Sequence, residues 1–237
     1  MPHDDPANDA AGDAPWLRGW PEIHDTRVQA AFTRVPRSAF VGSALRPWAT
    51  CDRALPIGEG QTISQPFVVA LMTQALALQP GMRVLEVGTG SGYQTAILCE
   101  LTAQVDRVPG ENIWSIERYD TLSAQAKRVL NELGYYPHLF VGDGAVGWFP
   151  AAPYDAIMVT AAASALPRPL WEQLADGGRL VIPIGPATEG QVLWLVVRRG
   201  RQLARRMLGG VRFVPLISPI LDDPEQWIEL SPPPSRA

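Results

Sequence analysis

The chain has 237 residues, of which 46% are hydrophobic and 19% are charged. These values fit one large α/β domain and exclude a mainly disordered protein. A net charge of −4 argues against nucleic acid as a partner, because proteins that hold a phosphate backbone carry a basic stripe. No apolar run approaches the ~18 residues needed to span a membrane, so we expect no membrane partner.

Both ends of the chain have the composition of disordered tails. Residues 1–15 hold four aspartates among alanines and prolines without an apolar period, and residues 231–237 are dominated by proline and serine. We expect a single folded domain over residues 16–230 between these tails.

A segment rich in turn-forming and polar residues, 55–66, precedes a helix that we expect over 66–78. Pro66 suits the first turn of that helix. Ser64, just before it, has two interpretations. In the first, the side chain of Ser64 or Gln65 caps the helix. In the second, the hydroxyl and the helix N-terminus form a site for an anion such as a carboxylate.

The strand that we expect at Arg83–Val87 runs into a glycine-rich loop and then into a helix. The loop reads Gly88-Thr89-Gly90-Ser91-Gly92. Glycines let the backbone turn tightly and approach a ligand closely, while the helix behind them presents free N–H groups. The G-x-G-x-G spacing differs from the G-x-G-x-x-G of dinucleotide-binding proteins.

Alternating strands and helices continue along the chain. The expected elements are the strands Ile113–Glu117, Leu139–Val141, Ala156–Thr160 and Arg179–Pro183 and a helix over 121–133 that Gly134 ends. Several of these strands are continuous apolar runs, as is typical of strands covered on both faces. The fold class that this order predicts is α/β, with a doubly wound, mostly parallel sheet.

The last two expected strands, Val192–Val197 and Val211–Pro215, are joined by Arg198–Arg206. This connection is too short to contain a long crossover helix, which a parallel pair would need. We therefore expect a C-terminal antiparallel hairpin at the edge of the sheet.

Three acidic residues, Glu86, Glu117 and Asp143, lie at the carboxyl ends of successive expected strands. A carboxylate in the position of Glu117 can bind both hydroxyls of a ribose, and the turn at Asp143 can place a polar group at an adenine edge. Glu86, which we place at the mouth of the cleft, would repel a pyrophosphate but suit a cation. S-adenosylmethionine carries a ribose, an adenine, an ammonium and a sulfonium without phosphate, so the cleft favours it over NAD.

The three histidines and two cysteines show no metal-ligand spacing and no hydrolase triad, so we expect no metal. Cys51 and Cys99 are far apart in the sequence, and we favour free thiols over a disulfide. No basic segment followed by an apolar one is visible near the N-terminus. We therefore expect a cytoplasmic enzyme, and we expect it to be a monomer.

Seven stretches together carry a resemblance to a known family. They are PIGEGQTISQP (56–66), VLEVGTGSGYQ (84–94), SIER (115–118), GDG (142–144), YDAIMVTAAA (154–163), QLADGGRLVIPIG (173–185) and VRFVPL (211–216). Over about residues 25–217 the chain resembles the protein-L-isoaspartate (D-aspartate) O-methyltransferase family. The glycine loop is shared by many methyltransferases, whereas 61–66 and 159–163 are much more particular to this family.

The resemblance implies a Rossmann-like enzyme that moves a methyl group from S-adenosylmethionine onto the α-carboxylate of L-isoaspartyl residues. Its partners would be damaged peptides and proteins that contain isoaspartate, and the methyl ester would start their repair through a succinimide. By resemblance, Ser64 is the active-site serine, Thr62 and Ile63 lie in the wall between cofactor and substrate, and Val214 helps to hold the substrate backbone. The cofactor-binding set would be Thr62, Ile63, Glu86, Gly88, Thr89, Gly90, Gly92, Glu117, Asp143 and Gly144, and the substrate-binding set Thr62, Ser64 and Val214.

One stretch departs from the family pattern, because the loop at 102–111 is several residues longer than expected. We interpret it as a surface loop that leaves the end of the Glu117 strand in place.

Two other functions remain open at this point. One is a carboxyl methyltransferase that tailors one dedicated peptide, and the other is a nucleoside-binding module without catalysis. An NAD-dependent oxidoreductase is disfavoured by the glycine spacing and by Glu86.

Overall fold

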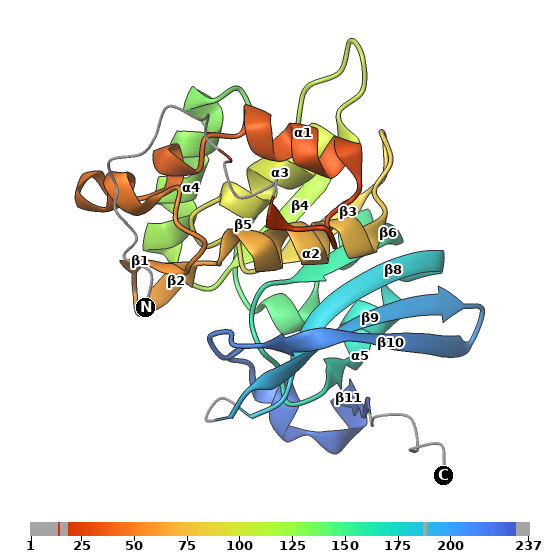
Figure 1. Cartoon of the computed structure of the whole chain (residues 1–237). Coiled ribbons are helices and arrows are strands. Elements are labelled where there is room, and N and C mark those ends of the chain that lie inside the picture. Colours follow the sequence, from red (N-terminus) through yellow and green to blue (C-terminus); the bar gives the residue numbers. More distant parts are fainter. Residues whose placement is uncertain (1–13, 15–18, 187–188, 231–237) are drawn as a thin grey trace.

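The computed structural model describes residues 14, 19–186 and 189–230, and a seven-stranded sheet forms its centre (Figure 1). The order is β10-β9-β8-β6-β3-β4-β5. The strands are β3 (Val84–Val87), β4 (Ile113–Glu117), β5 (His138–Val141), β6 (Tyr154–Val159), β8 (Leu174–Ile184), β9 (Gln191–Arg199) and β10 (Gln202–Val211). The five strands from β8 to β5 are parallel, and β9 and β10 are antiparallel. The fold class predicted from the sequence is confirmed.

Helices cover both faces of this sheet. One face packs against α1 (Thr26–Arg34), α2 (Pro66–Leu76), α3 (Tyr93–Thr102) and α4 (Asp120–Glu132). The other face packs against α5 (Arg168–Glu172) and a small two-stranded sheet of β7 (Leu166–Pro167) and β11 (Trp227–Ile228). Short 3₁₀ helices complete the connections: η2 (Arg37–Phe40), η3 (Ser43–Trp48), η4 (Gly144–Val146), η5 (Phe149–Ala151), η6 (Pro219–Asp222) and η7 (Pro224–Gln226).

The alternation of side chains along β3 assigns its residues to the two cores. Val84 belongs to the core beneath α1–α4, and Leu85 and Val87 belong to the core beneath α5. Because successive residues of a strand point to opposite faces, Glu86 faces the α3 side together with Val84. All four residues are buried, as expected for a central strand with both faces covered.

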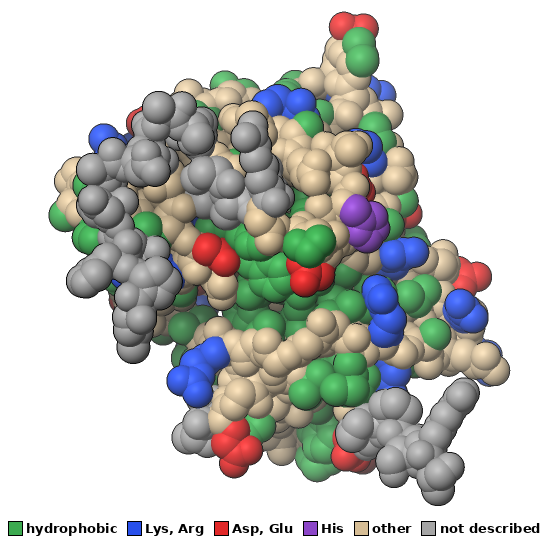
Figure 2. Space-filling view, in the orientation of Figure 1, with side chains coloured by type: hydrophobic (Ala, Val, Ile, Leu, Met, Phe, Trp, Pro, Cys, Tyr) green, Lys and Arg blue, Asp and Glu red, His purple; other side chains and the backbone are tan. Residues whose placement is uncertain are grey.

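A second small hairpin lies before α2. It consists of β1 (Leu55–Gly58) and β2 (Gln61–Ile63), which turn at Glu59 and Gly60, both with positive φ. Two residues with φ > 0 are what a two-residue hairpin turn of the favoured type requires. This hairpin carries the chain into Ser64. In the orientation of Figure 1, hydrophobic side chains gather in a hollow between α2 and the β9–β10 hairpin (Figure 2).

The C-terminal hairpin is confirmed, but the residues predicted for its second strand are wrong. The turn is at Gly200 and Arg201, and β10 runs from Gln202 to Val211, so it contains much of the arginine-rich stretch predicted as the connection. Residues 211–215 instead run beside Ala162, whose N–H donates to the Val214 carbonyl at 2.8 Å. The apolar pattern of this segment reflects packing over a cavity and not a place in the main sheet.

The other predicted elements are close to the observed ones. The helix predicted over 66–78 ends at Leu76, where Ala77 adopts a left-handed conformation, and the helix over 121–133 is α4, followed by Gly134 at φ 83°. The tails predicted at 1–15 and 231–237 lie outside the described residues, apart from Ala14. A single domain over 16–230 stays a prediction. Among the described residues, no helix is long and apolar enough to cross a membrane.

Candidate active site

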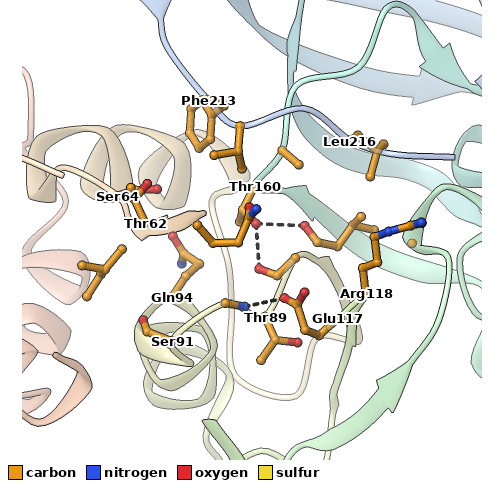
Figure 3. Close-up of a pocket in the computed structure, with 18 of the residues that line it drawn as sticks. Thr62, Ser64, Thr89, Ser91, Gln94, Glu117, Arg118, Thr160, Phe213 and Leu216 are labelled. Carbon is orange, nitrogen blue, oxygen red and sulfur yellow. Dashed lines mark hydrogen bonds between the residues drawn. The ribbon is translucent and has the colours of Figure 1, made fainter. Parts of the chain in front are cut away.

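A cavity opens at the carboxyl ends of the central parallel strands. It lies between these strand ends, the β2–α2 connection and the segment after β10 (Figure 3). In doubly wound sheets, ligands bind at this edge, where the chain connections leave neighbouring strands in opposite directions. The predicted site residues that line it are Thr62, Ile63, Ser64, Gly88, Thr89, Gly90, Glu117, Gly144 and Val214. Segments that are about 150 residues apart in the sequence therefore meet in one site.

The glycine loop forms the floor of the cavity. Gly88 has φ 96°, and a Cβ atom placed on it would lie 2.2 Å from Thr160 Oγ1, far inside van der Waals contact. The Thr160 hydroxyl is within hydrogen-bonding distance of the carbonyls of Val87 and Gly88, at 3.0 and 2.7 Å. Only glycine combines this backbone conformation with this close approach. The loop is thereby held against β6 with its backbone open to the cavity.

Glu117 lies at the end of β4 and its carboxylate is tied to the glycine loop. One oxygen accepts the Gly90 N–H at 2.8 Å, and the other accepts the Tyr119 N–H at 3.0 Å. Only 5% of the residue is exposed. A carboxylate has about four acceptor positions, so these two bonds leave capacity for the two hydroxyls of a ribose. The long 102–111 loop has left this strand end in place, as predicted.

Glu86 is the clearest correction to the sequence prediction. It does not stand at the mouth of the cleft, because it is fully buried on the α3 side of β3. Its Oε2 atom accepts hydrogen bonds from Thr95 and Ser115, both at 2.6 Å, and Ser115 in turn lies 2.6 Å from the Thr89 hydroxyl. The strand alternation that buries Glu86 is the physical reason. Glu86 therefore does not stand where it could repel a pyrophosphate, contrary to the sequence prediction.

Two further predicted residues also lie behind the cavity wall. Asp143 caps η4 by accepting the Ala145 N–H, and its other oxygen accepts the Ser218 hydroxyl at 2.6 Å. Gly92 is the N-cap of α3 with φ 88°, and a Cβ atom placed on it would lie 3.2 Å from Leu130 Cδ1. Neither is among the residues that line the cavity, whereas Gly144, beside Asp143, is.

Ser64 lies at the opposite side of the cavity from Glu117, near Phe213 (Figure 3). It does not cap α2. The Phe67 N–H, in the first turn of that helix, donates to Asp52 Oδ1 at 2.9 Å, and no side chain of the N-cap residue takes part. The first interpretation is therefore wrong, since Asp52 and neither Ser64 nor Gln65 caps the helix, and Ser64, which lines the cavity, stays a candidate for binding a carboxylate.

Several residues that line the cavity were not predicted from the sequence. Thr160 follows an apolar strand in the same way as Glu117, so the rule that found the acidic residues would have found it had hydroxyls been included. Tyr119, Gln94, Phe213 and Leu216 also line the cavity. No local signal distinguishes the last two from core residues, since they reach the site only through the crossing of the C-terminal segment over β6.

The chemistry of the lining suits a nucleoside without phosphates. Among the described lining residues, Glu117 is the one acidic side chain and Arg118 the one basic side chain. Arg118 is exposed and donates to the Ile217 carbonyl at 3.2 Å. The described lining residues therefore include no cluster of basic side chains that could bind a pyrophosphate. No group of metal-ligating side chains occurs in the part of the chain that the structure describes. Fold and cavity together define the class of S-adenosylmethionine-dependent methyltransferases.

The comparisons with known proteins narrow this class. The model of the protein-L-isoaspartate (D-aspartate) O-methyltransferase family matches residues 17–220, and the chain belongs to this family. The protein-L-isoaspartate O-methyltransferase of Anaeromyxobacter dehalogenans is 51% identical over 206 residues, which cover 86% of this chain and 94% of that protein. Protein-L-isoaspartate O-methyltransferase 1 of Syntrophobacter fumaroxidans is 49% identical over 196 residues, which cover 82% of this chain and 87% of that protein.

Solved structures agree with this assignment. A protein-L-isoaspartate O-methyltransferase superposes with a TM-score of 0.75 at 30% identity, covering 86% of this chain and 64% of that one. A putative enzyme of the same kind from Plasmodium falciparum, solved with S-adenosyl-L-homocysteine, superposes with a TM-score of 0.72 at 27% identity, covering 84% and 93%.

The contact between Gly88 and Thr160 leads to a first prediction. Gly88→Ala should destabilise the protein and weaken the binding of S-adenosylhomocysteine about tenfold or more, because the new methyl group displaces the loop. Gly134→Ala is the matched control: φ is 83° there, but no atom lies within 4 Å of the added Cβ. The control should lose about 1–2 kcal/mol of unfolding free energy and retain binding. Calorimetric titration with S-adenosylhomocysteine measures the affinity of both variants. Equal affinity of the two variants would contradict the prediction.

Burial leads to a second prediction, about pH. Desolvation, opposed by the hydrogen bonds from Ser115 and Thr95, raises the pKa of Glu86 from 4.5 to about 7. A raised folded-state pKa means that this group's contribution to stability is complete below about pH 4.5 and is lost as the pH rises through about 7. Glu86→Gln removes that titration. The unfolding free energy of the wild type relative to Glu86→Gln should therefore fall between pH 5 and pH 8 in urea titrations, and an increase over this range would refute the assignment.

Proposed function

We propose that this protein transfers the methyl group of S-adenosylmethionine to the α-carboxylate of L-isoaspartyl residues in damaged proteins and peptides. The observation that carries the proposal is the cavity itself. It places the glycine loop and Glu117, which suit a nucleoside, in one enclosure with Ser64 and Val214, which suit a peptide carboxylate. The family, and two relatives of that name that are 51% and 49% identical to this chain, support the same activity.

The reaction needs little acid–base chemistry from the protein. The substrate carboxylate has a pKa near 4 and is therefore already ionised, and nucleophilic, at pH 7. S-adenosylmethionine, when bound, supplies a methyl group on a positively charged sulfur. What remains for the protein is to orient one carboxylate oxygen and to exclude water. Among the described residues that line the cavity, Glu117 is the one carboxylate and none is histidine or lysine, which is consistent with that task.

We assign the orienting role to Ser64. Its hydroxyl would donate a hydrogen bond to the substrate carboxylate and would not form a covalent bond. Thr62 and Ile63, which precede it on β2, would form the wall shared by substrate and cofactor. Val214 would hold the substrate backbone, and its position is supported by the hydrogen bond from Ala162 to its carbonyl.

The cofactor would lie along the carboxyl ends of β3 and β4. Glu117 would bind the ribose hydroxyls, and the backbone of Gly88, Thr89 and Gly90 would face the ligand. Gly144 would lie beside the adenine. Glu86, Gly92 and Asp143 would support this site from behind, because none of them lines the cavity.

Methylation would lead to repair without further help from the enzyme. A methyl ester carries a better leaving group than a carboxylate, so the neighbouring amide nitrogen displaces methanol and forms a succinimide. Hydrolysis of the succinimide gives a mixture that includes normal aspartate.

We further propose that the protein acts in the cytoplasm, as a monomer, and without nucleic acid. Cys51 and Cys99, both described by the structure, are free thiols, which suits a reducing compartment. The net charge of −4 gives no electrostatic basis for holding a phosphate backbone.

Methyl transfer to paired peptides tests the activity. With cofactor labelled on its methyl group, isoaspartyl peptides of unrelated sequence should become labelled, and the matching aspartyl peptides should not. Cofactor binding with no labelled peptide would establish a nucleoside-binding module instead. Labelling of one cognate sequence and no other isoaspartyl peptide would favour an enzyme with one dedicated substrate.

Replacement of Ser64 tests its role. Ser64→Ala should lower kcat roughly 100-fold, because the carboxylate loses its alignment, while the affinity for S-adenosylhomocysteine stays within about twofold. Thr121→Ala, which removes an exposed hydroxyl that donates to Glu59, is the control and should leave both quantities unchanged. Parallel loss of turnover and cofactor affinity would make Ser64 a structural residue.

A further inference from the structure

Arg37 is a buried cation whose partners are backbone carbonyls. It lies in η2, only 1% of the residue is exposed, and its guanidinium donates to Ala49 O at 2.8 Å and to Arg53 O at 2.9 Å. A third bond, at 3.1 Å, reaches the carbonyl of Ser64, and a longer one, at 3.5 Å, that of Cys51. Among the described residues, no carboxylate lies within ion-pair distance of Arg37.

Burial of a charged side chain costs desolvation free energy. We therefore expect its hydrogen bonds to provide something that an apolar side chain cannot. Burial lowers the pKa of Arg37 to about 10, so it is still charged at neutral pH. An apolar residue of similar volume in this place would avoid the desolvation cost. The planar fork of arginine, in contrast, joins two separate pieces of backbone with donors in fixed directions. Here those pieces are the 49–53 connection and the residue that we assign to orient the substrate.

Asp52, in that same connection, fixes the residues that follow Ser64. Its Oδ1 atom accepts the Phe67 N–H at 2.9 Å, and its Oδ2 atom accepts the side-chain amide of Gln65 at 3.0 Å. The backbone is therefore fixed at Ser64 itself and again three residues later. These two anchors fix the backbone from which the Ser64 side chain projects toward the cavity.

We propose that Arg37, together with Asp52, is a positioning residue for methyl transfer, which holds the backbone of Ser64 so that its hydroxyl faces the substrate carboxylate. Neither residue lines the cavity, and neither touches a reacting atom. The inference rests on the proposed function, and it adds residues from the 37–53 region, which contributes none of the described residues that line the cavity. It predicts that damage to this anchor appears in turnover and not in cofactor binding.

The test uses Arg37→Lys and Arg37→Met in the full chain. Lysine keeps the charge but offers its donors from one nitrogen, so it cannot join the same carbonyls on both sides. Both variants should lose about tenfold or more in kcat for an isoaspartyl peptide, with the affinity for S-adenosylhomocysteine within about threefold of the wild type. Arg27→Met is the matched control, because Arg27 also donates to backbone carbonyls, those of Leu78 and Leu101, away from the cavity. The control should be less stable, because it loses these bonds, but its kcat should be unchanged.

A double-mutant cycle separates positioning from general stabilisation. If Arg37 acts through Ser64, then adding Arg37→Lys to Ser64→Ala should cause no further loss of kcat. Losses that multiply would overturn the proposal, as would wild-type kcat in the folded single variants. If neither Arg37 variant is folded at the assay temperature, Asp52→Ala decides, because Asp52 is exposed and restrains the same segment; unchanged kcat in that variant overturns the proposal. A wild-type protein that methylates no isoaspartyl peptide would instead refute the proposed function.

Discussion

Gly88 lies so close to Thr160 that no side chain fits between them, and the site is built around this contact. Gly88 follows β3 and Thr160 follows β6, and these two strands are neighbours at the centre of the sheet. The Thr160 hydroxyl bonds to the carbonyls of the loop and so keeps it against the sheet. Thr160 fixes the loop on one side, and the Glu117 carboxylate, which accepts the Gly90 N–H, fixes it on the other. The loop backbone therefore presents one stable surface to a ligand.

The two halves of the cavity come from different parts of the chain and are stabilised in different ways. The half that we propose for the nucleoside is built on rigid parallel strands, where side-chain direction follows from strand alternation. The half that we propose for the peptide is built on connections: the β1–β2 hairpin, the start of α2 and the segment after β10. Connections need additional bonds to hold one conformation. The carbonyl contacts of Arg37, the cap from Asp52 and the Ala162–Val214 bond provide them.

The sequence predicted the sheet class and the glycine loop, because these depend on local signals such as apolar runs and glycine spacing. It also predicted nine of the residues that line the cavity, of which Thr62, Ile63 and Val214 came from the family resemblance. It misplaced Glu86, whose orientation is decided by which face of β3 turns toward α3 and not by its position next to the loop. It also misassigned 211–215 as a strand, since an apolar segment that crosses a cavity has the same pattern as a strand. Arg37 carried no signal at all, because its partners are carbonyls that only the folded chain brings together.

The proposed function requires one cavity to align an ionised carboxylate with the sulfur of the cofactor and to do little else chemically. A crystal structure with S-adenosylhomocysteine and an isoaspartyl peptide tests this requirement most directly. We expect the sulfur above the 88–90 backbone, the ribose at Glu117 and the peptide carboxylate within hydrogen-bonding distance of the Ser64 hydroxyl. A nucleoside bound elsewhere, or a carboxylate that faces away from Ser64, would contradict it.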